Sequence, residues 1–311
     1  HEGTLVCDLN NDRVVQLSFP NSNPKSCILI SNDFKEGDIV RPSGLCSFKK
    51  YVIVADRTNG VINIYDESLL HTQSLAMNRN LHRPSSVALI REENKDLLVI
   101  MERGSGKDSK LGIFNINLNG ICVESDFKLD QKIKLYDPQD MDSDNSSNIY
   151  IANTMEREIL KISSQGELLN KANLIEISGH ARILVKCVQV RTSDQTIFTA
   201  DFEKKIIFHF DQNLELLGCI DLSSNLEIEA IRSVYPLKDS LLLCVRGKNQ
   251  VIQIGYDGSL IQTMDVTAST SIDWHNPTKI SILDSGNICI ADKENDRIIA
   301  LDINGKFLSS T

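Results

Sequence analysis

Short apolar runs separated by polar turns recur along the whole chain, and the runs fall into groups of four. The second run of a group is the clearest, as in Tyr51–Asp56, Ile149–Asn153 and Thr196–Asp201, each of which ends in Asp or Asn. Four short apolar runs with turn residues between them are typical of a meander of four antiparallel β-strands. No segment of useful length shows the period of an amphipathic helix, so the pattern predicts an all-β protein.

The groups are copies of one repeat. Cys7–Leu17 aligns with Ala291–Leu301 as a small residue, an Asp, a polar turn containing Asn-Asp-Arg and an apolar strand. Complete copies start near residues 42, 84, 138, 187, 231 and 277, and residues 3–31 hold three strands of another copy. Self-similarity at this period, about 45 residues, is the signature of a repeat architecture.

Such repeats predict a β-propeller. One meander cannot bury both of its faces, whereas several meanders arranged radially pack on one another and leave only short edges. We expect four-stranded antiparallel blades, six or seven in number, because seven copies are counted and the first is incomplete. Residues 1–311 would form a single domain that closes between 1–31 and 277–311. Because His1 is not a natural initiator, we expect the chain to be a fragment of a longer protein.

Composition indicates a cytoplasmic protein with a large core. The hydrophobic fraction is 41%, and no apolar run approaches the roughly 20 residues needed to cross a membrane. The eight cysteines occupy strand positions where other repeats carry Val, Ile or Leu, and they form no CxxC or zinc-type pattern. This usage predicts free, buried thiols in a reducing compartment. We expect no cofactor, no membrane contact and no small-molecule substrate.

The last repeat resembles an NHL repeat. It runs from Pro277–Ile280 through Asn287–Asp292 to Asn295–Ile298, which is the NHL order of a strand, a strand ending in Ala-Asp, an Asn-Arg turn and a further strand. The same order appears around Val54–Asp56 and Asn59–Ile62. The chain is therefore similar to the C-terminal NHL propellers of tripartite-motif proteins, and the resemblance covers nearly its whole length.

The resemblance implies a recognition module that binds single-stranded RNA in post-transcriptional regulation. The alternative that it implies is a protein-interaction platform, for a ubiquitin-ligase substrate or a scaffold partner. Two repeats depart from the pattern, because Glu102 and Arg246 stand where other repeats carry Asp. NHL propellers of this type usually have six blades, which leaves the blade number open.

The charge distribution supports a basic binding surface. In such blades the turns between second and third strands and the linkers into each first strand share one side, here called the top face. They hold 21 Lys and Arg against 18 Asp and Glu, whereas the whole chain carries 33 against 42 and a net charge of −9. A basic face on an acidic body fits localised phosphate binding, and flat side chains there could stack on bases.

The predicted RNA- or partner-binding residues lie in these turns and linkers, and the second repeat contributes the densest group. They are Arg41, Arg57, Arg79, His82, Arg83, Arg103, Lys107, Lys110, Arg157, His180, Arg182, Arg246, Lys248, Trp274 and His275. Two alternatives stay open. The basic side chains could pair with acids of the same turns, and Trp274 could pack at a junction between blades.

The polar residues that end the second strands need a separate explanation. They are Asp8, Asp56, Asn153, Asp201 and Asp292. A carboxylate or amide before a tight turn can accept hydrogen bonds from backbone N–H groups, so we expect these side chains to be structural turn caps. The alternative is a ring of carboxylates that binds a metal, as in calcium-dependent lactonases.

An enzyme is the third functional class considered. Lactonases, esterases and amidating lyases with similar repeats need a metal held by oxygen or His ligands near the axis. The six histidines do not recur at one repeat position, and the sequence contains no GxSxG motif. The sequence therefore predicts a module without enzymatic activity and without a bound metal.

Overall fold

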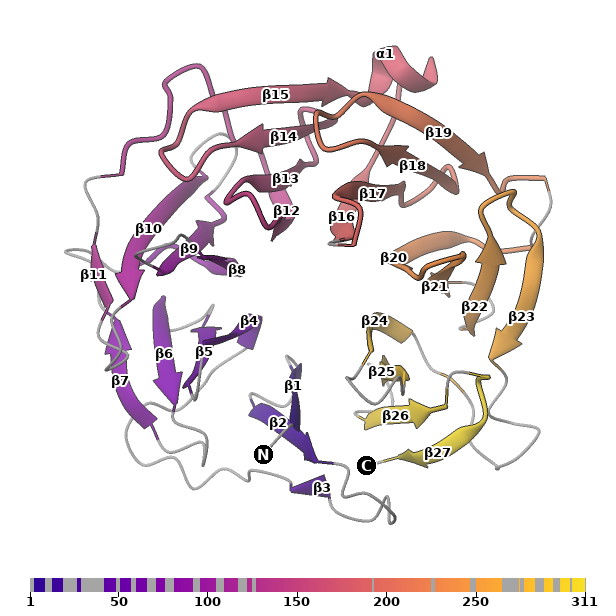
Figure 1. Cartoon of the computed structure of the whole chain (residues 1–311), viewed down its shortest axis with the longest axis horizontal. Helices are drawn as coiled ribbons and strands as arrows, with labels where there is room; N and C mark the ends of the chain where they lie inside the picture. The colour runs from indigo at the N-terminus through magenta and orange to yellow at the C-terminus, as the bar shows by residue number, and fades with distance from the viewer. Residues whose placement is uncertain are drawn as a thin grey trace. The chain divides into compact units, whose positions relative to one another are not determined.

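In the computed structural model the described residues form antiparallel β-sheets (Figure 1). The described residues are 3–8, 13–18, 27–28, 42–48, 51–56, 60–65, 71–75, 81–91, 96–104, 109–116, 122–124, 127–191, 193–224, 227–246, 250–264, 274, 277–282, 288–292, 297–302 and 304–310. The chain divides into two compact units. Unit 1 comprises residues 1–4, 17–27 and 174–311, and unit 2 comprises residues 5–16 and 28–173.

Unit 2 contains three four-stranded sheets in which strands adjacent in the sequence pair. They are built from β4 (Pro42–Phe48), β5 (Tyr51–Asp56), β6 (Val61–Tyr65) and β7 (His71–Leu75); β8 (Pro84–Arg91), β9 (Asp96–Glu102), β10 (Lys110–Ile116) and β11 (Cys122–Glu124); and β12 (Pro138–Ser143), β13 (Ile149–Asn153), β14 (Glu158–Ile162) and β15 (Leu168–Asn173). A shorter sheet, whose residues are divided between the two units, joins β1 (Gly3–Asp8), β2 (Arg13–Ser18) and β3 (Cys27–Ile28).

Unit 1 repeats the same arrangement in three further sheets. They are built from β16 (Val185–Arg191), β17 (Thr196–Asp201), β18 (Ile206–Phe210) and β19 (Leu216–Asp221); β20 (Ala230–Pro236), β21 (Ser240–Arg246), β22 (Gln250–Gly255) and β23 (Leu260–Met264); and β24 (Pro277–Ile282), β25 (Ile288–Asp292), β26 (Arg297–Leu301) and β27 (Phe307–Ser310). The prediction of an all-β chain with four-stranded antiparallel sheets is thus confirmed. The number of blades and the closure of a single domain stay predictions.

One short helix was not expected from the sequence. The helix α1 (Leu174–Ser178) directly follows β15, and its Leu174 side chain is buried. The Gly179 N–H donates a hydrogen bond to the Ile175 carbonyl (2.8 Å), and Gly179 adopts a φ of 71° that ends the helix. Five residues are too few for a helical period to be visible in the sequence.

Two β-bulges recur at fixed places in the sheets. Each first strand carries one extra residue opposite the end of its second strand, and in β20 this residue is Arg232. In most fourth strands the second residue is the extra one, as with Leu169 in β15, Leu217 in β19 and Ile261 in β23. A bulge bends its strand and redirects a side chain, so these positions are where the repeat can present particular residues.

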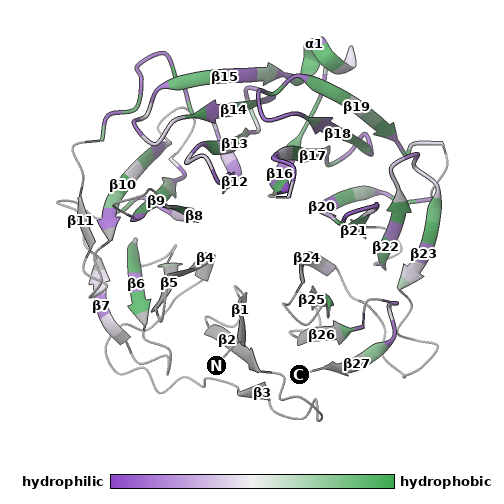
Figure 2. Cartoon of the chain, viewed as in Figure 1, coloured by the Kyte–Doolittle hydropathy of each residue, from purple (hydrophilic) through white to green (hydrophobic). Residues whose placement is uncertain are grey.

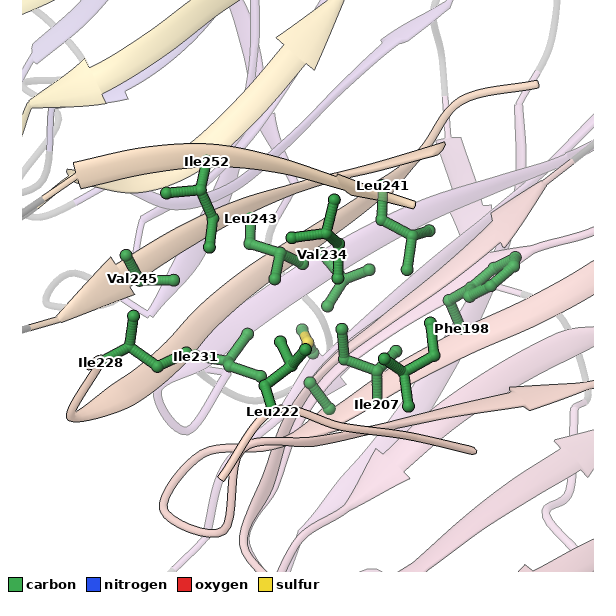
Figure 3. Close-up of a cluster of buried hydrophobic side chains, with 14 residues drawn as sticks. Phe198, Ile207, Leu222, Ile228, Ile231, Val234, Leu241, Leu243, Val245 and Ile252 are labelled. Atoms are coloured by element: carbon green, nitrogen blue, oxygen red, sulfur yellow. The ribbon is translucent and has the colours of Figure 1, made fainter. Parts of the chain in front are cut away.

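The core lies between neighbouring sheets. In unit 1, Phe198 and Ile207 from one sheet meet Leu241, Leu243 and Ile252 from the next sheet (Figure 3). Hydrophobic residues occur on strands such as β6, and hydrophilic residues occupy many of the turns (Figure 2). Full burial of one such aliphatic side chain contributes about 1.5–3 kcal/mol, so this interdigitation is a major source of stability.

Turns between third and fourth strands are held against the preceding sheet. Gly258, in the turn between β22 and β23, has a φ of 81°. A Cβ there would lie 3.0 Å from Cγ2 of Ile220 and 3.5 Å from Cδ2 of Leu222, both from the segment that ends the preceding sheet. Glycine satisfies the left-handed backbone and the close approach at once.

The described cysteines differ from one another. Cys187 and Cys244 are free and buried, as predicted, but Cys219 is free and exposed. The prediction of a buried thiol is wrong for Cys219, because the residue lies on the edge strand β19. No helix in the described part of the chain is long and apolar enough to cross a membrane. A cytoplasmic location stays a prediction.

Candidate functional site

The side chain that ends a second strand anchors the segment leading into the first strand. Asp201 ends β17 and is fully buried. Its Oδ2 accepts a hydrogen bond from the Leu184 N–H (2.7 Å), just before β16. Its Oδ1 accepts hydrogen bonds from the N–H groups of Glu203 (2.8 Å) and Lys204 in the following turn. One carboxylate therefore fixes both the linker and the turn at the top of this sheet.

The same anchor appears in two sheets of unit 2. Oδ1 of Asn153 accepts a hydrogen bond from the Tyr136 N–H (2.8 Å), and its Nδ2 donates to the Lys134 carbonyl (2.8 Å). Oε2 of Glu102 accepts a hydrogen bond from the His82 N–H (2.6 Å). The Glu that departs from the repeat pattern thus still holds its linker, because its longer side chain reaches the same kind of donor.

The remaining predicted caps, Asp8, Asp56 and Asp292, end β1, β5 and β25, and their side chains lie outside the described residues. Across the described ranges, no group of three or more His, Cys, Asp or Glu side chains is arranged to hold a metal ion.

Three side chains meet where β16, β17 and β20 come together at their top ends. The ring of Phe202 directly follows the Asp201 anchor and is only 9% exposed. Nζ of Lys186, from β16, lies 3.9 Å from the centroid of this ring, and Cζ of Arg232, from β20, lies 5.1 Å from it. Cation–π attraction at these distances holds both cations against one ring. We call Lys186, Phe202 and Arg232 the cation cluster.

The backbone fixes the cation cluster from both sides. The Phe202 N–H donates a hydrogen bond to the Leu184 carbonyl (2.9 Å), and the Ile231 N–H donates one to the Phe202 carbonyl (3.2 Å). Lys186 and Arg232 both lie in the bulges of their first strands. The bulges therefore present two basic side chains from neighbouring strands at one place.

Further charged residues surround the cation cluster in the same turns and linkers. His180, Arg182 and Lys204 are exposed and Lys205 is half-buried, while Glu203, Glu227 and Glu229 are exposed acids among them. The surface of unit 1 at this end is therefore basic at its centre and mixed in charge around it.

In unit 2, the predicted basic residues are partly engaged within the protein. His82, Arg83 and Lys110 are exposed. Arg103 instead donates two hydrogen bonds to Oδ1 of Asp137, at 2.5 and 3.0 Å, and forms an ion pair with that carboxylate. The alternative considered was pairing with acids of the same turn, whereas Arg103 pairs with an acid of the linker that leads into β12.

Other predicted residues are also occupied by contacts within the fold. Nη1 of Arg157 donates to the Met155 carbonyl (3.2 Å), and Arg246 lies 3.7 Å from a carboxylate oxygen of Glu229. Trp274 is 8% exposed, and its indole N–H donates to the Met264 carbonyl (2.9 Å). The Trp274 ring is thus part of a hydrophobic cluster rather than an open stacking surface. Arg41, Arg57, Arg79, Lys107, Lys248 and His275 lie outside the described residues.

Sequence reasoning did not single out the cation cluster. The first strand of its repeat was expected to start at Cys187, whereas β16 begins at Val185. No proline marks this start, so Lys186 was read as part of a linker. The signal available was the position of Phe202, directly after the Asp that ends the second strand.

At the opposite end of the same strands, a second polar group joins two sheets of unit 1. Arg191 donates hydrogen bonds to both carboxylate oxygens of Asp194, to the Leu237 carbonyl (3.1 Å) and to the Tyr256 hydroxyl. The hydrogen bonds from Arg191 lower the pKa of the Asp194 carboxyl to about 2. The Tyr256 hydroxyl donates to the Leu237 carbonyl (2.8 Å), and burial raises its pKa.

His209 is stacked inside this group. Its ring centroid lies 4.2 Å from that of Phe198, with the planes 10° apart. Its Nε2 is buried and has no hydrogen-bond partner within the described ranges. Burial lowers the pKa of His209, and the positive charge of Arg191 lowers it further. The arrangement therefore favours a neutral imidazole and a structural role.

Comparison with known proteins identifies the fold. No protein-family model and no curated protein sequence matches the chain. The chain is similar to virginiamycin B lyase from Staphylococcus aureus, with a TM-score of 0.65 and 11% identity over 87% of this chain and 83% of the lyase. It is also similar to the periplasmic gluconolactonase of Pseudomonas aeruginosa, with a TM-score of 0.68 and 10% identity over 100% of this chain and 96% of that chain.

A third similar structure is the WD40 β-propeller domain of Doa1, with a TM-score of 0.60 and 14% identity over 87% of this chain and 82% of that domain. The fold is that of a β-propeller. At such low identities the similarity shows the fold alone, so membership of the NHL family stays a prediction.

These similarities correct the prediction that the chain has no enzymatic activity. A lyase and a gluconolactonase share its fold, so the argument from repeat pattern to a non-catalytic module is wrong. That argument required histidines at one position of every repeat. A catalytic site needs only one set of residues, and a propeller can supply that set from blades that differ from one another.

Proposed function

We propose that unit 1 binds an acidic segment of a partner protein at the cation cluster. The observation that carries this proposal is the placement of Lys186 and Arg232, from neighbouring first strands, against the single buried ring of Phe202. Side chains already held in place lose less conformational entropy when they bind a ligand. A carboxylate-bearing segment would extend from this centre over Arg182 and Lys204.

Two observations favour a protein over single-stranded RNA as the ligand. Exposed Glu203, Glu227 and Glu229 lie among the basic residues. They would repel carboxylates as well as phosphates, but a peptide can place its carboxylates against Lys186 and Arg232 and uncharged residues beside these acids, whereas RNA carries a phosphate at every nucleotide. Buried Trp274 offers no surface on which a base could stack. A protein partner that carries charges of both signs can complement a surface of this kind.

Fluorescence anisotropy would test the proposal with two labelled probes, an acidic peptide of Glu and Ser residues and a single-stranded RNA of mixed sequence. Titrations at about 50 and about 200 mM salt separate a few charge contacts from extensive phosphate contacts. We expect the peptide to bind, and the combined substitutions Lys186→Glu and Arg232→Glu to weaken it at least about tenfold. The control is Lys238→Glu, an exposed lysine in the turn between β20 and β21.

RNA binding that falls steeply with salt and is lost in the double variant would make RNA the ligand of this surface. Equal peptide affinity of the wild type and the double variant would show that the cation cluster does not bind the peptide.

A further inference from the structure

A separate surface is formed by the free edge of β19. Within the described residues, β19 is the last strand of its sheet and pairs only with β18. Leu216 and Leu217 are 43% and 55% exposed, and Cys219 is exposed as well. Figure 2 shows β19 coloured hydrophobic along most of its length. An apolar edge strand is a ready template for another strand, and proteins normally protect such edges.

Other fourth strands of the chain show the protection that β19 lacks. In β15 and β23 the exposed aliphatic residues are followed by two polar residues, Asn170 and Lys171 in β15 and Gln262 and Thr263 in β23. In β7 all the described side chains are polar. In β19 the corresponding residues are Gly218 and Cys219. Among the fourth strands whose side chains are described at these positions, β19 alone presents an uninterrupted apolar centre.

Gly218 is not required by the fold of unit 1. A Cβ at this position would meet nothing within 4 Å, and its φ lies outside the left-handed region that favours glycine. Glycine inside a strand often marks a β-bulge or a place where another backbone approaches closely, and Gly218 directly follows the bulge residue Leu217. The residue is therefore suited to an incoming strand rather than to the chain's own packing.

The charges at the two ends of β19 indicate which strand would fit. Glu215, just before the strand, and Asp221, at its end, are both exposed. Hydrogen bonds from Ser223 lower the pKa of the Asp221 carboxyl, and nearby His180 lowers it further. An antiparallel second copy centred on Gly218 would place Glu215 opposite the Asp221 of the other copy. Like charges directly opposite are destabilising, so self-pairing is disfavoured.

We propose that β19 is a docking edge for an extended segment of a partner protein, with apolar residues at its centre and Lys or Arg at both ends. The segment would add a fifth strand to the sheet β16–β19, with main-chain hydrogen bonds giving affinity and the terminal charges giving specificity. This site is independent of the cation cluster, because it takes a ligand of opposite charge.

The test uses a short capped peptide of alternating Ile and Thr with Lys at both ends. Control peptides carry Glu in place of Lys, or Pro at the centre. Cys219 reports occupancy, because peptide-level mass spectrometry can follow its alkylation by iodoacetamide. We expect the Lys-ended peptide to slow alkylation of Cys219 and the Pro peptide to have no effect. The Glu-ended peptide should bind about tenfold more weakly.

Two variants make the test specific to β19. Leu217→Lys places a charge at the exposed bulge and should abolish protection, whereas Ile261→Lys, at the equivalent bulge of β23, should leave protection unchanged. Glu215→Lys should shift the preference toward the Glu-ended peptide, which a general loss of folding could not produce. Unfolding midpoints of the variants should match that of the wild type, because the substituted side chains are exposed.

Equal protection of Cys219 by all peptides, or in the Leu217→Lys variant, would overturn the proposal. Protection that rises with protein concentration without peptide, together with a dimer in sedimentation velocity, would assign the edge to a second copy instead. Because binding at β19 does not involve Lys186 or Arg232, the double reversal of the cation cluster should leave it intact.

Discussion

At the scale of single residues, the polar side chain that ends a second strand is the element most tightly built into the fold. Asp201 and Asn153 stand at equivalent places and are both fully buried. One is a carboxylate and the other an amide, yet each accepts a hydrogen bond from the linker into the first strand. The fold therefore requires an acceptor at this position and not a particular charge.

The substitution Asp201→Ala should lower the free energy of unfolding by about 3 kcal/mol or more, because it leaves three N–H groups without their acceptor. Asp201→Asn should cost less than Asp201→Ala, about 1–2 kcal/mol, since its amide oxygen can still accept on one side but its amide nitrogen cannot accept from the N–H groups on the other. Urea unfolding of the two variants measures the difference. Equal losses would mean that the charge, not the acceptor geometry, is what matters.

His209 should make the stability depend on pH. Burial and Arg191 lower its folded pKa, while Asp194 acts in the opposite direction with a smaller effect. Between the folded pKa and the ordinary value of about 6.5, the unfolded chain binds the proton first. The stability contributed by neutral His209 is therefore complete above about pH 6.5 and falls as the pH drops below that value.

The variant His209→Phe should remove this pH dependence and keep the stacking on Phe198. It also removes a buried nitrogen that lacks a partner in the described residues, so we expect it to be more stable than wild type by about 1 kcal/mol at low pH. Thermal unfolding at about pH 7.5 and about pH 5.5 compares the two proteins on either side of the ordinary His pKa. If wild type and His209→Phe differ in stability by the same amount at both pH values, His209 is not the source of the pH dependence.

At the scale of elements, the sequence predicted strands well and their irregularities poorly. β5, β13 and β17 have the bounds expected from the apolar runs, because a strand buried on both faces, as β13 and β17 are, leaves a short continuous apolar run bounded by turn residues. The bulges left no trace in these runs, since one extra residue redirects side chains without changing the apolar content of the strand. The cation cluster depends on such bulges, and this is why it was missed.

Turns between third and fourth strands should be sensitive to a single methyl group. Gly166 has a φ of 88°, and a Cβ there would lie 2.5 Å from the Lys128 carbonyl oxygen and 2.6 Å from the ring of Phe127. We expect Gly166→Ala to lower the free energy of unfolding by roughly 2–4 kcal/mol, through backbone strain and the clash together.

A matched control separates these two effects. Gly179 also has a positive φ, of 71°, but a Cβ there would meet nothing within 4 Å. Gly179→Ala should therefore cost only the conformational strain, about 1 kcal/mol. Chemical denaturation of both variants gives the comparison. A loss for Gly166→Ala no larger than that for Gly179→Ala would show that the turn does not pack as described.

At the scale of the whole molecule, the repeat predicted the fold class because each copy alone leaves a hydrophobic face uncovered. The similar solved structures agree on a β-propeller, and the shared fold includes enzymes as well as a WD40 domain. The repeat did not predict the function in the same way. Repeats are maintained by packing, whereas the proposed site depends on residues that break the repeat, Lys186 and Arg232.

If residues 1–311 form one closed domain, units 1 and 2 should unfold together. We expect a single transition in urea, with the same midpoint by circular dichroism and by the fluorescence of Trp274, which lies in unit 1. Two transitions, with only the later or earlier one reported by Trp274, would show that the units are separate cooperative domains.

The most direct test of the proposed function is hydrogen–deuterium exchange of the whole chain with and without the acidic peptide of Glu and Ser. Binding at the cation cluster predicts new protection in residues 182–186, 202–205 and 229–232, and no change on β19. Protection confined to unit 2, or to β19, would contradict binding at the cation cluster even if the peptide binds elsewhere on the protein.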